Sequence, residues 1–242
     1  MPIKERLRIY FYRLWNSLFE TWWKIAGLFS RSEGIVLMYH HVTDLPVDAP
    51  STCVCTVKDF IHSLEDLEGN GYHFIPIENI EEAVRSHTTR FAVVTFDDVP
   101  ESALKNAVPY LKKEKIPYTF FVGVDFLKRE GFISEEQLKE LAEDPLCTVG
   151  SHSYSHSSLR HSGSLERELK QSKKYLEVLL GREVEYVAYP YGTLASVSGR
   201  VQRYARECGY LMAFGTLSAT ITDISFKKKF FLPRMVINNL HL

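Results

Sequence analysis

Four side chains of this chain have the types and the spacing of a metal-dependent hydrolytic site. Asp97 and Asp98 are adjacent at the end of the apolar run Phe91–Phe96, and three residues separate His152 from His156. Two adjacent carboxylates repel each other unless a cation or a proton lies between them. Two histidines at this spacing share one face of a helical turn, which is a common arrangement of metal ligands. Together these residues predict a site for a divalent cation.

The chemistry that such a site supports is hydrolysis. Two neutral imidazoles and one carboxylate leave coordination positions open for water, as a catalytic zinc ion requires. A bound divalent ion lowers the pKa of its water and polarises a carbonyl oxygen, and the second aspartate can then accept a proton from that water. This set is suited to an amide or an ester and does not identify the substrate. Two simpler interpretations stay open: Asp98 caps a following helix, and the histidine pair arises by chance.

The elements that position these residues follow from alternating apolar runs and helical patterns. Successive strand–helix units predict parallel strands with right-handed crossovers, and about seven such units can close into a barrel. Chemistry in such folds lies at the carboxyl ends of the strands, where Tyr39-His40-His41 and Tyr189-Pro190-Tyr191-Gly192 also stand. Strands are expected at 35–39, 72–75, 91–96, 118–122, 148–151, 186–189, 211–214 and within 230–237, and helices at 57–67, 78–85, 103–113, from 134, 165–180 and 200–208. Ser134 and Gln137 fit a capping box for the helix that starts there.

The composition is that of an ordinary globular protein. Of 242 residues, 45% are hydrophobic and 24% are charged, and the net charge is −1. These values exclude a disordered, collagen-like or coiled-coil chain, and they give no overall reason to expect nucleic acid as a partner. The cysteines Cys53, Cys55, Cys147 and Cys208 lack zinc-binding spacing and disulfide density. We therefore expect free thiols, which favours a reducing compartment.

Residues 1–31 differ from the rest of the chain. They hold six basic residues, two acidic residues and all three tryptophans, and their apolar residues recur at helical spacing. This pattern predicts an amphipathic helix over 1–31, followed by a catalytic domain over 32–242. Charged residues interrupt any apolar stretch that could span a membrane, and no signal-peptide core is present. The helix either lies on a membrane surface or packs on the protein body or another subunit, and an atypical export signal is a third interpretation.

Three motifs stand in a characteristic order along the chain. They are Thr95-Phe96-Asp97-Asp98, His152-Ser153-Tyr154-Ser155-His156 and Tyr189-Pro190-Tyr191-Gly192. They resemble the motifs of polysaccharide deacetylases, the group with the NodB-homology domain, and the likeness extends over about residues 35–237. The early Leu37-Met38-Tyr39-His40-His41-Val42 and the late Leu232-Pro233-Arg234 resemble one branch, which includes deacetylases that act on poly-N-acetylglucosamine.

The resemblance implies a distorted (β/α)₇ barrel and a role for each motif. Asp97 would be the general base, and the backbone N–H of Tyr191 would help to stabilise the oxyanion. In the branch with the early Tyr-His, a histidine near the N-terminus supplies the general acid, and His40 is the candidate here. The divalent metal, with Zn²⁺ favoured and Co²⁺, Ni²⁺ or Mn²⁺ as alternatives, would be held by Asp98, His152 and His156.

Two departures from the family pattern affect the site. Many members have glycine after the aspartate pair, where this chain has Val99. Many also have an arginine that tunes the base where this chain has Ala188, and we expect Arg234 to replace it. The remaining residues expected to contact substrate are Tyr154, Tyr189, Pro190 and His41.

The sequence therefore predicts a hydrolase that removes N-acetyl groups from N-acetylhexosamine units of a glycan and releases acetate. Two alternatives remain: an O-acetyl esterase acting on a glycan, and a non-catalytic glycan-binding or assembly protein on the same fold. The absence of a clear signal peptide favours a cytoplasmic or peripherally membrane-associated protein, while the family resemblance also allows an extracytoplasmic one.

Overall fold

The computed structural model describes residues 17, 18, 21 and 32–236. The amphipathic helix predicted over 1–31 therefore lies almost entirely outside the described residues, and its packing stays a prediction. Within the described part of the chain, no helix is both long enough and apolar enough to cross a membrane.

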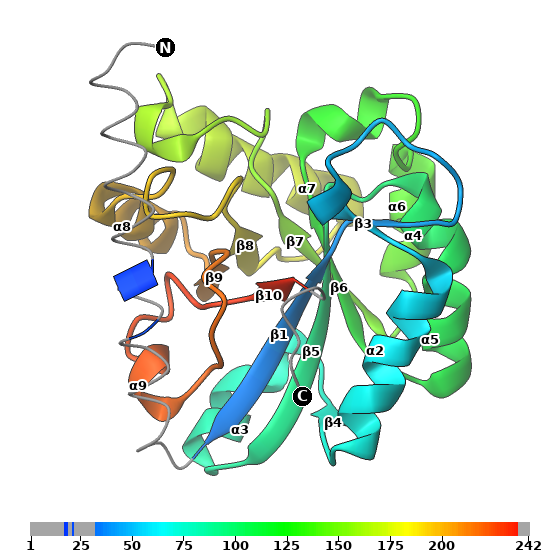
Figure 1. Cartoon of the computed structure of the whole chain (residues 1–242). Helices are drawn as coiled ribbons and strands as arrows, with labels where there is room; N and C mark the ends of the chain where they lie inside the picture. Colours follow the sequence, from blue (N-terminus) through cyan, green and yellow to red (C-terminus); the bar gives the residue numbers. More distant parts are fainter. Residues whose placement is uncertain (1–16, 19–20, 22–31, 237–242) are drawn as a thin grey trace, which may run out of the picture.

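A parallel sheet forms the centre of the molecule and curls around its own axis (Figure 1). The strand order is β10-β1-β5-β6-β7-β8-β9, with β4 paired to β5 outside this path. Every pair of neighbouring strands in this sheet is parallel, as the alternation of strands and helices predicts. The strands are β1 (Glu33–Tyr39), β4 (His73–Phe74), β5 (Thr89–Asp97), β6 (Tyr118–Val122), β7 (Cys147–Ser151), β8 (Tyr186–Ala188), β9 (Met212–Phe214) and β10 (Met235–Val236).

The chain that leads into β10 closes the barrel. The N–H of Leu232 donates to the carbonyl oxygen of Ala213 at 2.8 Å, and the N–H of Gly215 donates to the carbonyl oxygen of Leu232 at 2.8 Å. Leu232 thus forms a parallel bridge with Phe214 of β9, while β10 itself pairs with β1. The predicted distorted (β/α)₇ barrel is confirmed.

Helices fill the connections and lie on the outside of the sheet (Figure 1). The predicted capping box is confirmed at the start of α6, because the side chain of Ser134 accepts from the N–H of Gln137 and the side chain of Gln137 accepts from the N–H of Ser134. The α-helices are α2 (Val57–Gly69), α3 (Ile80–Arg85), α4 (Glu101–Asn106), α5 (Val108–Glu114), α6 (Glu135–Ala142), α7 (Ser172–Leu180), α8 (Gly199–Glu207) and α9 (Asp223–Phe226). The 3₁₀ turns are η1 (Ser51–Cys53), η2 (Ile77–Asn79), η3 (Val124–Lys128) and η4 (Leu159–His161), and η5 (Glu166–Gln171) is a π-helix.

Several observed elements differ from the predicted ones, and three of the differences concern helices and strands near predicted ranges or motifs. The helix predicted over 103–113 is divided at Ala107, because Pro109 in the first turn of α5 has no N–H to continue the ladder. The helix predicted over 165–180 begins with the π-helical segment η5. A small parallel sheet of β2 (His41–Val42) and β3 (Val54–Cys55) was not predicted, since two-residue strands have no periodicity to detect.

Alternation along the strands sends side chains to two separate cores. One core lies between the sheet and the helices, and Val94 and Phe96 belong to it. The other fills the barrel interior with Phe91, Val93 and residues of the other strands, and apolar side chains of α3 join it. Asp97 has the same phase on β5 as Phe91 and Val93, so its side chain points into the barrel.

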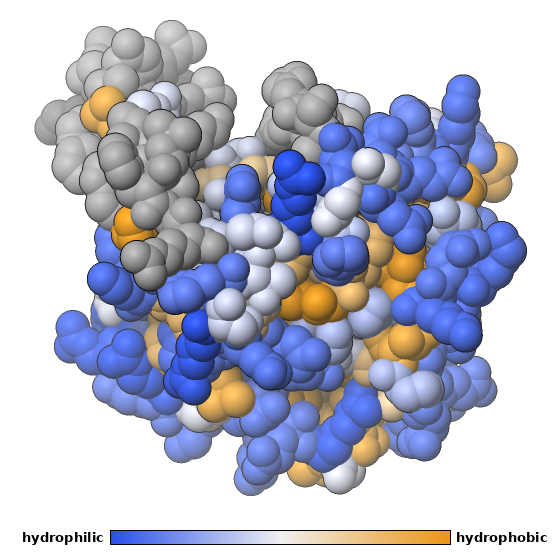
Figure 2. Space-filling model, turned by 90° about the horizontal axis from the view of Figure 1, so that it is seen from below, coloured by the Kyte–Doolittle hydropathy of each residue, from blue (hydrophilic) through white to orange (hydrophobic). Residues whose placement is uncertain are grey.

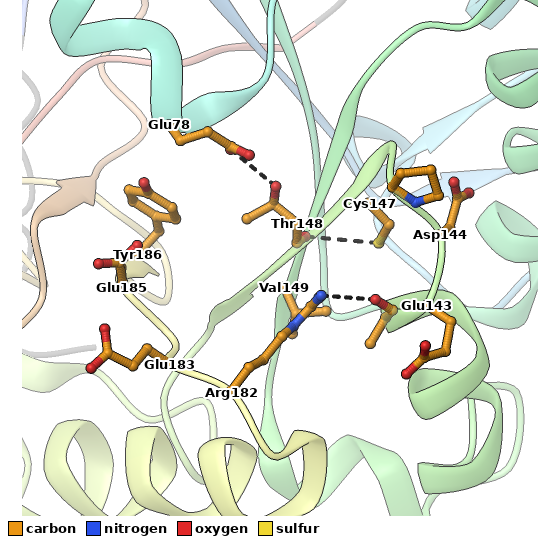
Figure 3. Close-up of a pocket in the computed structure, with 12 residues that line it drawn as sticks. Glu78, Glu143, Asp144, Cys147, Thr148, Val149, Arg182, Glu183, Glu185 and Tyr186 are labelled. Atoms are coloured by element: carbon orange, nitrogen blue, oxygen red, sulfur yellow. Dashed lines mark hydrogen bonds between the residues drawn. The ribbon is translucent and has the colours of Figure 1, made fainter.

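A cavity of about 550 Å³ lies at the amino-terminal ends of β7 and β8, and Figure 3 shows the residues that line it. Viewed from below, hydrophilic residues dominate the surface of the molecule, with hydrophobic residues in scattered patches (Figure 2). The cavity is lined by acidic side chains, and two of them have clear protein partners. Asp144 accepts from the hydroxyl of Tyr118 at 2.6 Å, and Glu78 accepts from the hydroxyl of Thr148 at 3.1 Å.

Candidate metal centre

The loops after β5, β7 and β8 have unusual backbone conformations. Eight described residues other than glycine have positive φ, and five of them lie in these three loops. Positive φ costs roughly 1–2 kcal/mol in a residue that has a Cβ atom. Five such residues in three neighbouring loops indicate a functional site, where the surrounding structure holds the backbone in a strained conformation. Val99, a β-branched residue, takes the left-handed conformation that glycine would adopt without strain. The five residues are Asp98, Val99, Ser153, His156 and Tyr191.

Three predicted ligands converge at the carboxyl end of the barrel. One ligand atom from each of Asp98, His152 and His156 lies within 4.8 Å of the other two. Nε2 of His156 is 3.6 Å from Oδ1 of Asp98, and Nε2 of His152 is 3.7 Å from the same oxygen. Ligand atoms about 2.0–2.2 Å from a tetrahedral zinc ion lie roughly 3.3–3.6 Å apart, so the three residues are spaced to share one ion.

The spacing of the two histidines predicts that they reach this position on a helical turn, but the structure has no helix there. His152 directly follows β7, and the chain to His156 is an irregular loop with positive φ at Ser153 and His156. The N–H of His156 donates to Oγ of Ser153 at 3.0 Å, which tightens the loop. The convergence of the two rings is therefore correct, while the helical reason for it is wrong.

The imidazole of His152 is oriented by the backbone of the neighbouring strand. Its Nδ1 lies 2.8 Å from the carbonyl oxygen of Ala188 in β8, so Nδ1 carries the proton and Nε2 is left as an acceptor. A second bond of this kind fixes the tautomer of metal-binding histidines in general. Burial lowers the pKa of His152 to about 3, opposed by the charge of Asp97, which keeps the ring neutral.

Asp98 is the clearest indication that a cation belongs in the site. Its Oδ1 is buried and has no hydrogen-bond partner among the described residues. Burial and the charge of Asp97 raise the pKa of Asp98 to about 7. A divalent ion between Oδ1 and the two imidazoles would satisfy this oxygen and reverse the cost of ionising the carboxyl. The residues present thus fit a divalent metal.

Asp97 is held differently, by a buried arginine. Nη1 and Nη2 of Arg234 donate to its two carboxylate oxygens at 2.6 and 2.7 Å, and Nε of Arg234 donates to the carbonyl oxygen of Gly215 at 3.0 Å. Neither Asp97 nor Arg234 is more than 2% exposed. Burial alone would raise the pKa of Asp97, but the guanidinium of Arg234 outweighs it and holds the pKa well below its usual range. Arg234 thus pairs with Asp97, as predicted, while Ala188 carries no charge that could do so.

His40 lies at the carboxyl end of β1, within the electrostatic influence of the centre. Burial lowers its pKa, the charge of Asp97 raises it, and Arg234 lowers it again. The net effect keeps the imidazole neutral at neutral pH in the free protein. His41 has other contacts: its Nδ1 lies 3.2 Å from Oγ of Ser102, and its ring packs edge-on with that of Phe132.

The loop after β8 brings one exposed residue to the centre. Tyr191 is 59% exposed, and its ring lies 5.0 Å from the ring of His156. Its carbonyl oxygen accepts from the hydroxyl of Thr216 at 2.9 Å, and its N–H has no hydrogen-bond partner among the described residues. This N–H is therefore available to a ligand.

Three residues predicted to contact substrate are buried or packed against other side chains. Tyr189 is fully buried, and its hydroxyl donates to the carbonyl oxygen of Phe230. Pro190 is buried as well. The ring of Tyr154 packs against Tyr175 and under the guanidinium of Arg167, beside a second cavity of about 440 Å³ next to α7. The prediction is therefore wrong for Tyr189 and Pro190, which are buried, while contact of a substrate with Tyr154 stays a prediction.

Sequence reasoning missed an aromatic wall beside His156. The rings of Phe126 and Phe132 stack at 4.7 Å, and Phe126 lies 5.5 Å from the ring of His156. The guanidinium of Arg129 lies over Phe126, and its charge opposes the rise in the pKa of Asp98. A Phe-x₂-Arg-x₂-Phe spacing is present in the sequence, but nothing marks it as adjacent to the histidine loop.

Comparison with known proteins agrees with this arrangement. The poly-β-1,6-N-acetyl-D-glucosamine N-deacetylase of Staphylococcus aureus (strain MRSA252) is 27% identical over 161 residues, which are 60% of this chain and 54% of the relative. The chain thus spans about half the length of the curated relatives it matches. Two solved structures have similar folds. One is a polysaccharide deacetylase from Bacillus cereus (TM-score 0.75, 26% identity, 85% of this chain and 65% of that chain), and the other is IcaB from Ammonifex degensii (TM-score 0.68, 27% identity, 84% and 91%).

A family model supplies the assignment. The model described as polysaccharide deacetylase matches residues 85–213, which include the aspartate pair, both histidines and the loop after β8. The strand order, the closed barrel and the converging ligands are consistent with that match. This chain belongs to the polysaccharide deacetylase family.

Proposed function

We propose that the protein is a metal-dependent deacetylase that hydrolyses N-acetyl groups on N-acetylhexosamine units of a glycan and releases acetate. The observation that carries the proposal is the convergence of Asp98, His152 and His156 beside a buried Asp97. The names of the relatives support the substrate class, because the Staphylococcus aureus proteins are N-deacetylases of poly-β-1,6-N-acetyl-D-glucosamine.

Asp98, His152 and His156 would hold the divalent ion, and zinc is the ion we propose. Two imidazole nitrogens and one carboxylate oxygen form a donor set that zinc accepts while keeping a position open. When bound, the ion supplies Lewis-acid chemistry, because it lowers the pKa of water and polarises a carbonyl oxygen.

Asp97 would act as the general base. Its carboxylate stays ionised because Arg234 donates to both of its oxygens, and each oxygen retains a lone pair for a proton. A carboxylate with a lowered pKa is a weak base, so it accepts a proton only from a water that is already acidified. The burial of the pair excludes bulk water that would compete for that proton.

The leaving amine requires a proton, and His40 is the proposed donor. His40 is neutral in the free protein, so the proton has to reach it after the substrate binds. Asp97 gains a proton from water in the preceding step, and its charge acts on His40. Asp97 is therefore the proposed source of the proton that His40 donates. The free N–H of Tyr191 would donate to the negative oxygen that develops on the acetyl carbon.

The test is acetate release from N-acetylglucosamine oligomers, measured with metal content. We expect the purified chain to bind about one equivalent of zinc, to lose activity on chelation, and to regain it when zinc is restored. Bound zinc without acetate release from these oligomers would contradict the substrate proposal. No bound metal after restoration would contradict the centre itself.

We propose separately that residues 1–31 contact a membrane surface and place the enzyme there. The basic and tryptophan-rich composition of this segment supports the proposal. Sedimentation with anionic vesicles should recover the full chain and fail to recover a chain that starts at residue 32. Equal recovery of the two chains would contradict it.

A further inference from the structure

A buried carboxylate supports the loop that carries His156. Glu168 lies in the π-helix η5 and is only 4% exposed, although a charged side chain is rarely buried without a purpose. Its Oε2 accepts from the N–H of Ser155 at 2.9 Å and from the N–H of Tyr154 at 3.2 Å. Its Oε1 accepts from the hydroxyl of Ser155 at 2.7 Å. All three bonds go to the segment between the two histidines.

The opposite side of this loop is bound to η3. The N–H of Asp125 donates to the carbonyl oxygen of Tyr154 at 2.9 Å, and the N–H of Val124 donates to that of Ser153 at 3.3 Å. Glu168 thus accepts from the N–H groups of the loop, while N–H groups of η3 donate to its carbonyl oxygens. Ser153 and His156, the residues with positive φ, stand on either side of the bonded segment.

We infer that Glu168 is a positioning residue of the metal centre, whose carboxylate holds the loop 153–156 in the shape that directs His156 at Asp98. The inference rests on the metal site of the proposed function. Without the carboxylate, two N–H groups lose their acceptor, and the strained turn loses the interaction that offsets its cost. His152 is oriented independently by Ala188, so the effect falls on His156. The π-helix supports the inference, because π-bulges occur frequently beside functional sites.

The test compares Glu168→Ala with a matched variant at the other end of the barrel. Asp144 is a carboxylate whose side chain is 7% exposed, and it accepts from the hydroxyl of Tyr118 and the N–H of Leu146. It supports a loop as Glu168 does, but it is remote from the centre. Asp144→Ala therefore measures what losing a loop-supporting carboxylate does to the fold alone.

Zinc affinity is measured by competition with a chromogenic chelator, together with the melting temperature of the metal-free protein and the visible spectrum of the Co²⁺-loaded protein. Glu168→Ala should weaken zinc binding about 10–100-fold and change the Co²⁺ spectrum. Asp144→Ala should lower the melting temperature and leave zinc affinity within twofold of the wild type. Zinc affinity within twofold of the wild type in Glu168→Ala would overturn the inference.

Two milder variants keep the test valid if Glu168→Ala fails to fold. Glu168→Gln retains one acceptor oxygen, and Ser155→Ala removes only the hydroxyl bond. Both should weaken zinc binding by a smaller factor, with Glu168→Gln restoring most of the affinity lost in Glu168→Ala where both fold. Wild-type affinity in both milder variants would also overturn the inference. A wild-type chain that binds no zinc would overturn the proposed function, whereas a normal wild type with an unaffected Glu168 series would overturn only this inference.

Discussion

Both ends of the barrel carry buried acidic side chains, but the partners of these side chains differ between the two ends. At the amino-terminal end Asp144 pairs with Lys112 at 3.1 Å and accepts from Tyr118, beside a cavity of about 550 Å³ (Figure 3). At the carboxyl end Oδ1 of Asp98 is buried with no partner among the described residues, and two imidazole nitrogens face it. On the proposed function, an unsatisfied polar atom locates the site better than an open volume does.

The same substitution at both ends gives the largest expected contrast. Asp97→Asn should reduce acetate release from N-acetylglucosamine oligomers by about 10²–10⁴-fold, because an amide cannot accept the proton of water. Asp144→Asn should leave the rate within twofold of the wild type. Initial rates of the zinc-loaded proteins measure both. A rate above a tenth of the wild type in Asp97→Asn would break the distinction between the two ends.

Breaking the buried pair of Asp97 and Arg234 at the carboxyl end should also give a large loss in the free energy of unfolding. Arg234→Met leaves the carboxylate of Asp97 buried without its cation, and breaking such a pair costs about 3–5 kcal/mol. Urea unfolding of the metal-free proteins measures the difference. The double variant Asp97→Asn with Arg234→Met should lose less than the sum of the single variants, since it strands no charge. A loss below about 1 kcal/mol in Arg234→Met would mean that the pair is not the constraint we describe.

The leaving group separates the role of His40 from those of the other residues at that end. His40→Ala should slow release of N-acetyl groups by about 100-fold and release of matched O-acetyl groups by less than tenfold, because an alkoxide leaves more easily than an amine. Zinc content should stay at the wild-type level. Equal slowing of the two substrates would argue against proton donation, and an unchanged amide rate would remove His40 from the mechanism.

The smallest effect is expected at the amino-terminal end. Tyr118→Phe removes the hydroxyl that donates to Asp144 and should cost roughly 1–2 kcal/mol of stability with no change in acetate release. Burial raises the pKa of Asp144, but the Tyr118 hydroxyl and the Leu146 N–H outweigh it and lower the pKa below its ordinary value. The stability from this carboxylate is therefore present above that ordinary pKa and lost as the pH falls. The difference in the free energy of unfolding between Tyr118→Phe and the wild type, measured in urea, should become smaller at acidic pH.

Some of this site could be predicted from the sequence, because strand ends of a parallel barrel meet at one end. That rule brings Asp98 and the two histidines together without any knowledge of their loops. The loop conformation could not be predicted, since it depends on bonds to Glu168 and η3 that no periodicity records.

The error at Tyr189 has a physical reason that the sequence does contain. Tyr186 and Ala188 belong to the interior core, while Val187 and Tyr189 belong to the core under the helices. Alternation along β8 therefore turns Tyr189 away from the site, and its position in a motif gave the wrong expectation. Tyr191 lies beyond the strand, where alternation no longer applies, and it is the exposed residue of that loop.

The pairing of Arg234 with Asp97 also sets an order of events during synthesis. The two residues are 137 positions apart, so a ribosome adding about 5–20 residues per second makes them roughly 7–27 s apart. During that interval the nascent chain holds β5 without the cation that makes burial of Asp97 tolerable. Arg234 arrives on the segment that joins β9 to β1, so the segment that closes the barrel also brings the charge that pairs with Asp97. Pairing of the proposed catalytic base and closure of the barrel therefore depend on the same segment of chain, and both wait until that segment has been made.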